Sequence, residues 1–113
     1  DDEAALDAVT AVSGSGPAYY FLLMEAMQEV GIKMGLDAQT SKLLTLQTAL
    51  GAAQMALDSD VDVGELRRRV TSPAGTTEQA VNTFEAGGLR DLVEKAMNNC
   101  AKRAREMAKE LGE

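Results

Sequence analysis

The sequence contains no histidine and no tryptophan, and it has a single cysteine, Cys100, among its 113 residues. Histidine is the commonest general base and the commonest metal ligand in proteins. Its absence excludes Ser/His/Asp and Cys/His catalysis and leaves little support for zinc hydrolysis. The chain also lacks a G-x-x-x-x-G-K-S/T motif and a G-x-G-x-x-G motif after a strand. We therefore expect no metal site and no nucleotide cofactor bound by this chain alone.

Basic residues are scarce as well, with 11 lysines and arginines against 18 acidic residues and a net charge of −7. Nucleic acids and anionic membranes both require a basic face, so we expect neither as a partner. No apolar run reaches the roughly 20 residues that a transmembrane helix needs. One cysteine cannot form an internal disulfide, and the chain opens without a signal-peptide pattern. These features predict a cytoplasmic protein.

The sequence does contain helical periodicity along most of its length, with no strand-like alternation. An apolar fraction of 45% supports a packed core, and 113 residues correspond to a single domain, 1–113. The predicted fold is all-α, a helical bundle, with turns at Ser13–Pro17, Gly35 and Gly87 and a helix N-cap at Asp37. The expected helices cover residues 3–12, 17–34, 38–57, 63–69, 77–85 and 89–111.

The helices present more apolar surface than one short chain covers. The segment Ala18–Met24 is apolar on every side, so as a helix it must be buried all round. A chain of 113 residues has a high surface-to-volume ratio, and its segments 43–57 and 89–111 carry wide apolar stripes of their own. An intertwined homodimer, with Ala18–Met34 packed against a second copy, provides the cover. A compact monomeric bundle is the alternative.

The stretch 70–81 contains a turn built from a proline and a glycine that leads directly into a predicted helix. The first N–H groups of a helix have no partner inside it, and the helix dipole makes that end partly positive. The hydroxyls of Ser72, Thr76 and Thr77 accompany them, a combination that suits a small carboxylate or phosphate. Thr76-x-x-Gln79 also fits a capping box, and from these residues alone capping is the favoured interpretation.

The basic triplet Arg67-Arg68-Arg69 directly precedes this stretch. A run of arginines at the end of a helix usually interacts with solvent and with the negative end of the helix dipole. The alternative is that the triplet adds positive potential to an anion site beside it.

Two motifs are more specific together than either is alone. They are Ser13-Gly14-Ser15-Gly16-Pro17-Ala18-Tyr19 and Val70-Thr71-Ser72-Pro73-Ala74-Gly75-Thr76-Thr77, the second followed by Ala80-Val81 and Phe84-Glu85. In this order, with helices between and after them, they resemble pyrroline-5-carboxylate reductase in its C-terminal helical dimerisation domain. The resemblance spans nearly the whole chain. It departs from the family at Ala74, where many members have glycine, and at Val63, where proline or another favoured residue is expected.

The resemblance implies a function that composition alone does not supply. The family reduces 1-pyrroline-5-carboxylate to L-proline with NADPH or NADH, which is the last step of proline biosynthesis. A complete enzyme has an N-terminal dinucleotide-binding Rossmann domain, which this chain does not contain, followed by this domain. The chain would then be a dimerisation and substrate-binding part, inactive alone, that forms a homodimer, with assembly beyond the dimer left open. The alternative is a stand-alone helical dimerisation or anion-binding module without enzymatic activity.

The resemblance also implies roles for the residues of the second motif. Ser72 and the backbone N–H groups of Gly75, Thr76 and Thr77 would hold the substrate carboxylate. The Thr77 hydroxyl would lie beside the imine nitrogen as the catalytic group, acting by orientation or by relay through water because a threonine hydroxyl is a poor acid.

The first motif would lie beside the cofactor. By the resemblance, the turn Ser13-Gly14-Ser15-Gly16 lines the pocket near the nicotinamide, where Gly14 and Gly16 allow the backbone to approach closely. A helix-to-helix turn without a ligand is the alternative interpretation of the same residues.

Overall fold

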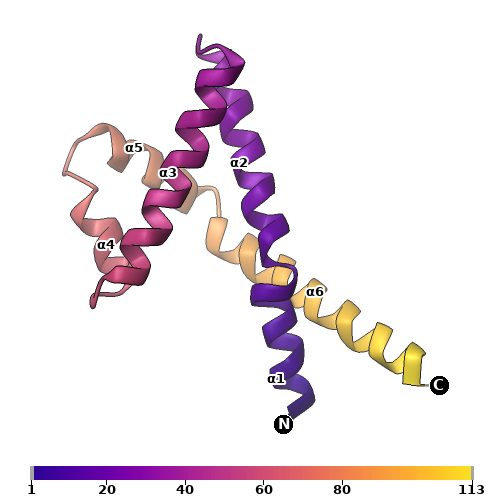
Figure 1. Cartoon of the computed structure of the whole chain (residues 1–113). Coiled ribbons are helices and arrows are strands. Elements are labelled where there is room, and N and C mark those ends of the chain that lie inside the picture. The colour runs from indigo at the N-terminus through magenta and orange to yellow at the C-terminus, as the bar shows by residue number, and fades with distance from the viewer. Residues whose placement is uncertain (1, 113) are drawn as a thin grey trace. The chain divides into compact units, whose positions relative to one another are not determined.

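The computed structural model describes residues 2–112, and over that range it contains helices and no strand. The all-α prediction is therefore confirmed. None of the described helices combines the length and the hydropathy that crossing a membrane requires. In chain order the elements are α1 (Asp2–Val9), the π-helix η1 (Thr10–Gly14), α2 (Gly16–Lys33), α3 (Ala38–Asp58), α4 (Val63–Arg69), α5 (Thr76–Ala86) and α6 (Leu89–Gly112) (Figure 1).

The chain divides into two compact units, one of residues 1–20 with 83–113 and the other of residues 21–82. Helix α2 begins in the first unit and continues in the second, and α5 returns the chain to the first. That residues 1–113 form a single domain stays a prediction.

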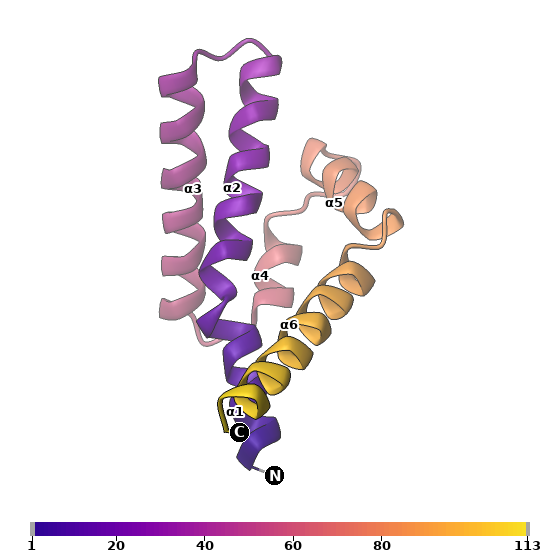
Figure 2. The ribbon, with the colours of Figure 1, turned by 90° about the vertical axis from the view of Figure 1, so that its right-hand side faces the viewer.

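In the second unit, α2 and α3 lie antiparallel and side by side (Figure 2). Helix α2 ends in a Schellman motif, in which Gly35 takes φ 112° and the N–H of Leu36 donates to the carbonyl of Gly31 at 3.1 Å. Asp37 caps α3, because its Oδ1 accepts the N–H of Thr40 at 2.8 Å. Both helix ends lie where the sequence predicts them.

The hairpin of α2 and α3 closes tightly near its loop. Ser41 is buried, with 2% of its surface exposed, and its hydroxyl donates to the carbonyl of Gln28 at 2.9 Å. Gly31 faces the same hydroxyl, and a Cβ at that position would overlap Ser41 Oγ. Glycine at position 31 is therefore what lets the two helices approach.

In the first unit, α1 and η1 both contact α6. The predicted turn at Ser13–Pro17 is corrected here: α1 ends earlier, at Val9, and the chain continues as a π-helix to Gly14 before α2 begins at Gly16. The N–H of Ser15 donates to the carbonyl of Thr10 at 2.8 Å, a bond across five residues. The helix widens here instead of stopping, and Pro17 is accommodated as the second residue of α2, where a backbone N–H is not needed.

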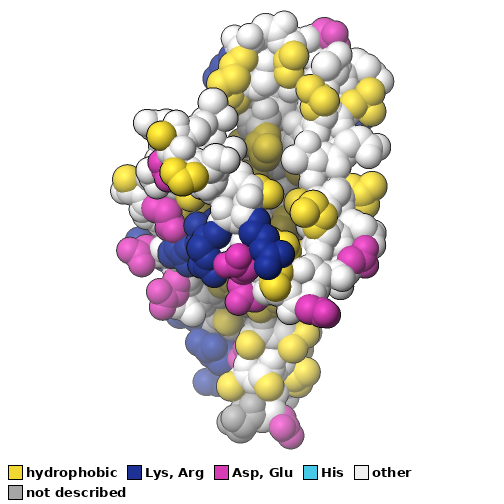
Figure 3. Space-filling model, turned by 90° about the vertical axis from the view of Figure 1, so that its left-hand side faces the viewer, with side chains coloured by type: hydrophobic (Ala, Val, Ile, Leu, Met, Phe, Trp, Pro, Cys, Tyr) yellow, Lys and Arg dark blue, Asp and Glu magenta, His cyan; other side chains and the backbone are white. Residues whose placement is uncertain are grey.

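Apolar burial within the chain is slight. Among the described residues, Ala11 is the apolar residue classed as buried, at 3% exposure. Hydrophobic side chains are spread over the face shown in Figure 3. The large exposed ones include Tyr20, Phe21, Leu22 and Leu23 in α2, Leu43, Leu44, Leu50 and Leu57 in α3, and Leu92, Val93, Met107 and Leu111 in α6.

The contact of Gly31 with Ser41 gives a prediction. Gly31→Ala should lower the free energy of unfolding by about 1–3 kcal/mol, because the added methyl group overpacks the hairpin. Ser41→Ala alone should cost about 1 kcal/mol for the lost hydrogen bond. In the double variant the alanine at position 31 no longer meets the hydroxyl. The double variant should therefore lose less free energy of unfolding than the sum of the two single losses, as measured by urea unfolding at one protein concentration. Strictly additive costs would contradict the close contact.

Candidate functional site

The connection from α4 to α5 forms the predicted anion site, and it lies within the second unit. Helix α4 is capped by Asp62, whose Oδ1 accepts the N–H of Glu65 at 3.1 Å, and it ends at Arg69 as predicted. After it the chain makes a tight turn, in which the N–H of Gly75 donates to the carbonyl of Ser72 at 3.0 Å. Helix α5 begins at the next residue. The turn therefore brings Ser72 up to the N-terminus of α5.

Backbone donors are free at this N-terminus. The N–H groups of Thr76, Thr77 and Glu78 have no hydrogen-bond partner among residues 2–112. The next N–H, that of Gln79, donates to the carbonyl of Gly75 at 3.4 Å and starts the helical pattern. Three adjacent N–H groups at the positive end of a helix are suited to an anionic oxygen ligand.

Hydroxyl groups lie at the same point of the chain. Those of Ser72, Thr76 and Thr77 make no hydrogen bond within the part of the chain that the structure describes. The capping box Thr76-x-x-Gln79 needs Thr76 to precede the helix, whereas Thr76 is already the first helical residue and the N–H of Gln79 donates to the carbonyl of Gly75. The expected cap is thus displaced by one residue, and the hydroxyls stay available.

Glu78 holds the turn against the start of the helix. Its Oε1 accepts the N–H of Ala74 at 2.8 Å, which fastens the turn to the first turn of α5. The N–H of Gly75 is likewise engaged inside the turn, so its predicted role as a ligand donor stays a prediction. Sequence reasoning named the N–H groups of Gly75, Thr76 and Thr77 and missed that of Glu78, because the resemblance carried over the motif residues and not the hydrogen bond that engages Gly75.

Ala74 takes φ 61°, the left-handed conformation that favours glycine. A Cβ at the neighbouring Gly75 would lie 3.2 Å from the carbonyl oxygen of Ser72, which is a tight contact. The turn therefore holds an alanine in a costly backbone conformation directly beside the free donors.

The basic triplet before the turn behaves mostly as a solvated helix end. Arg68 and Arg69 each pair with Glu65 at 3.1 Å, and the side chains of Glu65 and of both arginines are exposed. Hydrogen bonds from Arg68, and then from Arg69, lower the pKa of the Glu65 carboxyl. Exposed pairs of this kind add little stability. Figure 3 shows basic side chains grouped with acidic ones on one face.

The first motif, Ser13–Tyr19, lies in the other unit. There the structure adds Ala11 and Cys100 as hydrogen-bond partners of the motif. The Tyr19 hydroxyl donates to the carbonyl of Ala11 at 2.6 Å, and the Cys100 thiol donates to Ser15 Oγ at 3.2 Å. Ser13 Oγ donates to the carbonyl of Val9 at 3.1 Å. The predicted cofactor-facing segment is thus tied to its own helix and to α6.

Hydrogen bonding shifts the acidity of this group. Hydrogen bonding with Ser15, and then with Tyr19, lowers the pKa of the Cys100 thiol, against a smaller opposing effect of desolvation. The interaction with Cys100, followed by desolvation, raises the pKa of Tyr19. Sequence reasoning missed Cys100 because 85 positions separate it from Ser15 and no motif joins them.

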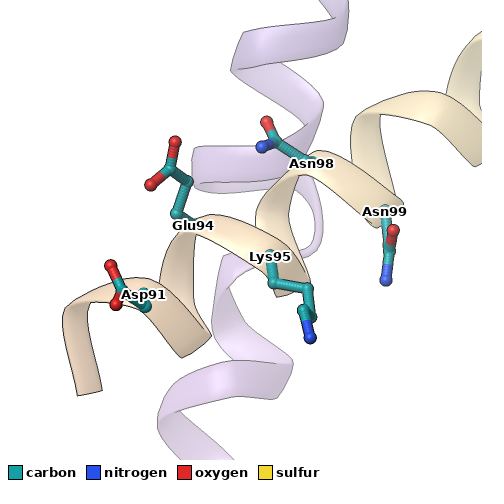
Figure 4. A pocket seen from close by; sticks show the side chains of 5 residues that line it. All are labelled: Asp91, Glu94, Lys95, Asn98 and Asn99. Atoms are coloured by element: carbon teal, nitrogen blue, oxygen red, sulfur yellow. The ribbon is translucent and has the colours of Figure 1, made fainter. Parts of the chain in front are cut away.

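Other hollows on the chain are open and lie along helix faces. One of about 430 Å³ lies on α6, and the side chains around it point away in several directions (Figure 4). No group of three or more Cys, Asp or Glu side chains suited to a metal ion occurs among residues 2–112. The residues lining the α6 hollow are Asp91, Glu94, Lys95, Asn98 and Asn99.

Comparison with known proteins assigns the chain to a class, that of helical dimerisation domains. Residues 3–107 match the family described as pyrroline-5-carboxylate reductase dimerisation. The chain therefore belongs to the pyrroline-5-carboxylate reductase dimerisation family, as the two motifs predict.

Individual relatives agree with this assignment. The chain is 63% identical over 113 residues to a pyrroline-5-carboxylate reductase of Pseudomonas aeruginosa, covering 100% of this chain and 41% of that protein. It is similar to the solved structure of a pyrroline-5-carboxylate reductase from Coxiella burnetii, with TM-score 0.90 and 51% identity over 94% of this chain and 39% of that one. A Plasmodium falciparum pyrroline carboxylate reductase, solved with NADP bound, has TM-score 0.87 and 34% identity over 90% of this chain and 40% of its own. The chain thus spans about two-fifths of the length of these relatives.

The conformation of Ala74 gives a prediction. Ala74→Gly should raise the free energy of unfolding by about 1 kcal/mol, since a left-handed conformation costs a residue with a Cβ about 1–2 kcal/mol. Ala80→Gly is the matched control inside α5, and it should lower the same quantity by about 1 kcal/mol. Thermal unfolding of both variants measures the difference. A loss of stability at both positions would mean that Ala74 is not held in this conformation.

Proposed function

We propose that this chain supplies the dimerisation surface and the substrate-carboxylate site of a reductase that converts 1-pyrroline-5-carboxylate to L-proline, the final step of proline biosynthesis. The observation that carries the proposal is the set of free donors at the N-terminus of α5. Three backbone N–H groups and three hydroxyls, all without partners among the described residues, gather in a segment of seven residues, 72–78. The family to which the chain belongs supports a carboxylate as the ligand of this donor set.

The donor set fits the chemistry of such a substrate. The substrate carboxylate accepts the N–H groups of Thr76 and Thr77 and the Ser72 hydroxyl, and the helix dipole favours its negative charge. Gly75 shapes the turn and lets the substrate approach the backbone. Glu78 already uses the N–H of Ala74, so its own carboxylate lies on the turn and the substrate anion enters from the Ser72 side.

Thr77 is the proposed catalytic group. Hydride adds to the imine carbon, and the imine nitrogen takes up a proton in the same reaction. The Thr77 hydroxyl is free to lie beside that nitrogen and to orient it or to relay the proton from water. The chain contains no histidine that could take this role.

The hydride donor is proposed to be NADPH or NADH, bound by a dinucleotide-binding domain outside residues 1–113. The relative from Plasmodium falciparum, solved with NADP bound, supports this choice. The segment Ser13-Gly14-Ser15-Gly16 fits a position beside the nicotinamide, because Ser13 and Gly14 are exposed there, whereas Gly16 is buried. Without that domain, the chain is expected not to transfer hydride.

The chain is further proposed to act as a homodimer in the cytoplasm. The support is the exposed apolar surface, above all in α2, where Tyr20, Phe21 and Leu22 are each about two-thirds exposed. An open hollow of about 420 Å³ between α2 and α3, lined by Phe21 and Leu46 among others, leaves room for apolar side chains of a second copy.

The full-length enzyme that contains this chain allows the test. Thr77→Ala should weaken proline binding in calorimetry by about 1.5–3 kcal/mol, the usual loss for a hydrogen bond to a charged group. It should also lower kcat for imine reduction, whereas Thr77→Ser keeps the hydroxyl and should retain most of both properties. Proline affinity and kcat that stay unchanged in Thr77→Ala would remove the role proposed for Thr77. A wild-type protein that neither binds proline nor reduces the imine would instead favour a dimerisation module without enzymatic activity.

A further inference from the structure

The carbonyl of Ala11 has an unusual partner. In an α-helix it would accept the N–H of Ser15, four residues later. Here the N–H of Ser15 donates to the carbonyl of Thr10 at 2.8 Å, as a π-helix requires. The Ala11 carbonyl accepts the Tyr19 hydroxyl instead, at 2.6 Å. A side chain from the second turn of α2 thus satisfies the backbone at the place where the helix widens.

The surroundings make this hydrogen bond costly to lose. Ala11 is 3% exposed, the neighbouring Gly16 is buried, and Tyr19 is half-buried. A buried carbonyl left without a donor costs more than an average hydrogen bond is worth. The chain would recover the loss by returning Ser15 to the Ala11 carbonyl, and that change would convert the π-helix to an α-helix and reorient the segment Thr10–Gly16.

We propose that Tyr19 is a positioning residue, whose hydroxyl holds the segment Thr10–Gly16 in its π-helical form and so sets the backbone that faces the nicotinamide. The proposal rests on the proposed function above for the ligand and on the Tyr19 to Ala11 hydrogen bond for the mechanism. Cys100 supports the same segment from α6 through Ser15. Tyr19 itself acts through the backbone.

The chain offers a matched control at the next position. Tyr20 is 66% exposed within one chain, on the α2 surface proposed for the dimer, and its hydroxyl makes no hydrogen bond within residues 2–112. Tyr20→Phe keeps the apolar ring that the dimer would bury, and sedimentation first establishes that both variants are still dimers. Replacing either tyrosine by phenylalanine removes the same single oxygen atom. A difference between the two variants therefore reports on the bond to Ala11.

Kinetics of the full-length enzyme test the claim. Tyr19→Phe should raise KM for the nicotinamide cofactor about five- to tenfold, the scale of one lost hydrogen bond. The KM for the imine substrate and the affinity for proline should stay at the wild-type value, because the carboxylate site belongs to a different segment. Tyr20→Phe should match wild type throughout. Equal cofactor KM values for the two variants would overturn the proposal, and so would a rise in both KM values alike.

A second readout does not depend on the reductase activity. Amide hydrogen exchange at Ser15 should be about tenfold faster in Tyr19→Phe than in Tyr20→Phe, because the π-helical form is no longer held.

The two readouts separate the two claims. If the wild-type enzyme shows no reductase activity, the proposed function fails, and exchange at Ser15 alone then decides the positioning role. Faster exchange in Tyr19→Phe supports that role, and identical exchange in the two variants overturns it.

Discussion

Removal of apolar helix surface from water is the interaction on which the rest of this structure depends. Fully burying one leucine or phenylalanine side chain gains about 1.5–3 kcal/mol. The chain realises little of this gain by itself, because Ala11 is the apolar residue classed as buried among those described, while α2, α3 and α6 expose large apolar side chains. A second copy would provide the missing cover, and obligate interfaces of that kind bury about 2,000–5,000 Å². Helices covered in this way would form a fixed support for the turns between them.

Both proposed binding segments depend on backbone groups that have no regular helical partner. At the N-terminus of α5 the free groups are N–H donors, and they are joined by the hydroxyls of Ser72, Thr76 and Thr77. Before α2 the exceptional group is a carbonyl, that of Ala11, which Tyr19 satisfies. The proposed site therefore needs neither histidine nor metal, since binding the anion and presenting open backbone to a cofactor are both tasks for the main chain.

Local signals predict much of this molecule. Asp37 caps α3, Gly35 ends α2, and α4 runs from Val63 to Arg69, because each of these depends on neighbours within a few positions. The π-helix is not predictable in this way. It depends on whether the N–H of Ser15 donates to the carbonyl of Thr10 or to that of Ala11. It also depends on hydrogen bonds from Tyr19 and from Cys100, which is distant in sequence. The anion site lies between these cases. Its hydroxyls are visible in the sequence, whereas the set of free N–H groups depends on the folded turn, in which the N–H of Gly75 is already bonded to Ser72.

The central claim is that a second copy of the chain covers the apolar faces, above all that of α2. Sedimentation equilibrium of residues 1–113 at micromolar concentration tests it most directly. The account predicts a species of twice the 12.0 kDa chain mass. A single species of 12.0 kDa, with its helices intact by circular dichroism, would contradict it.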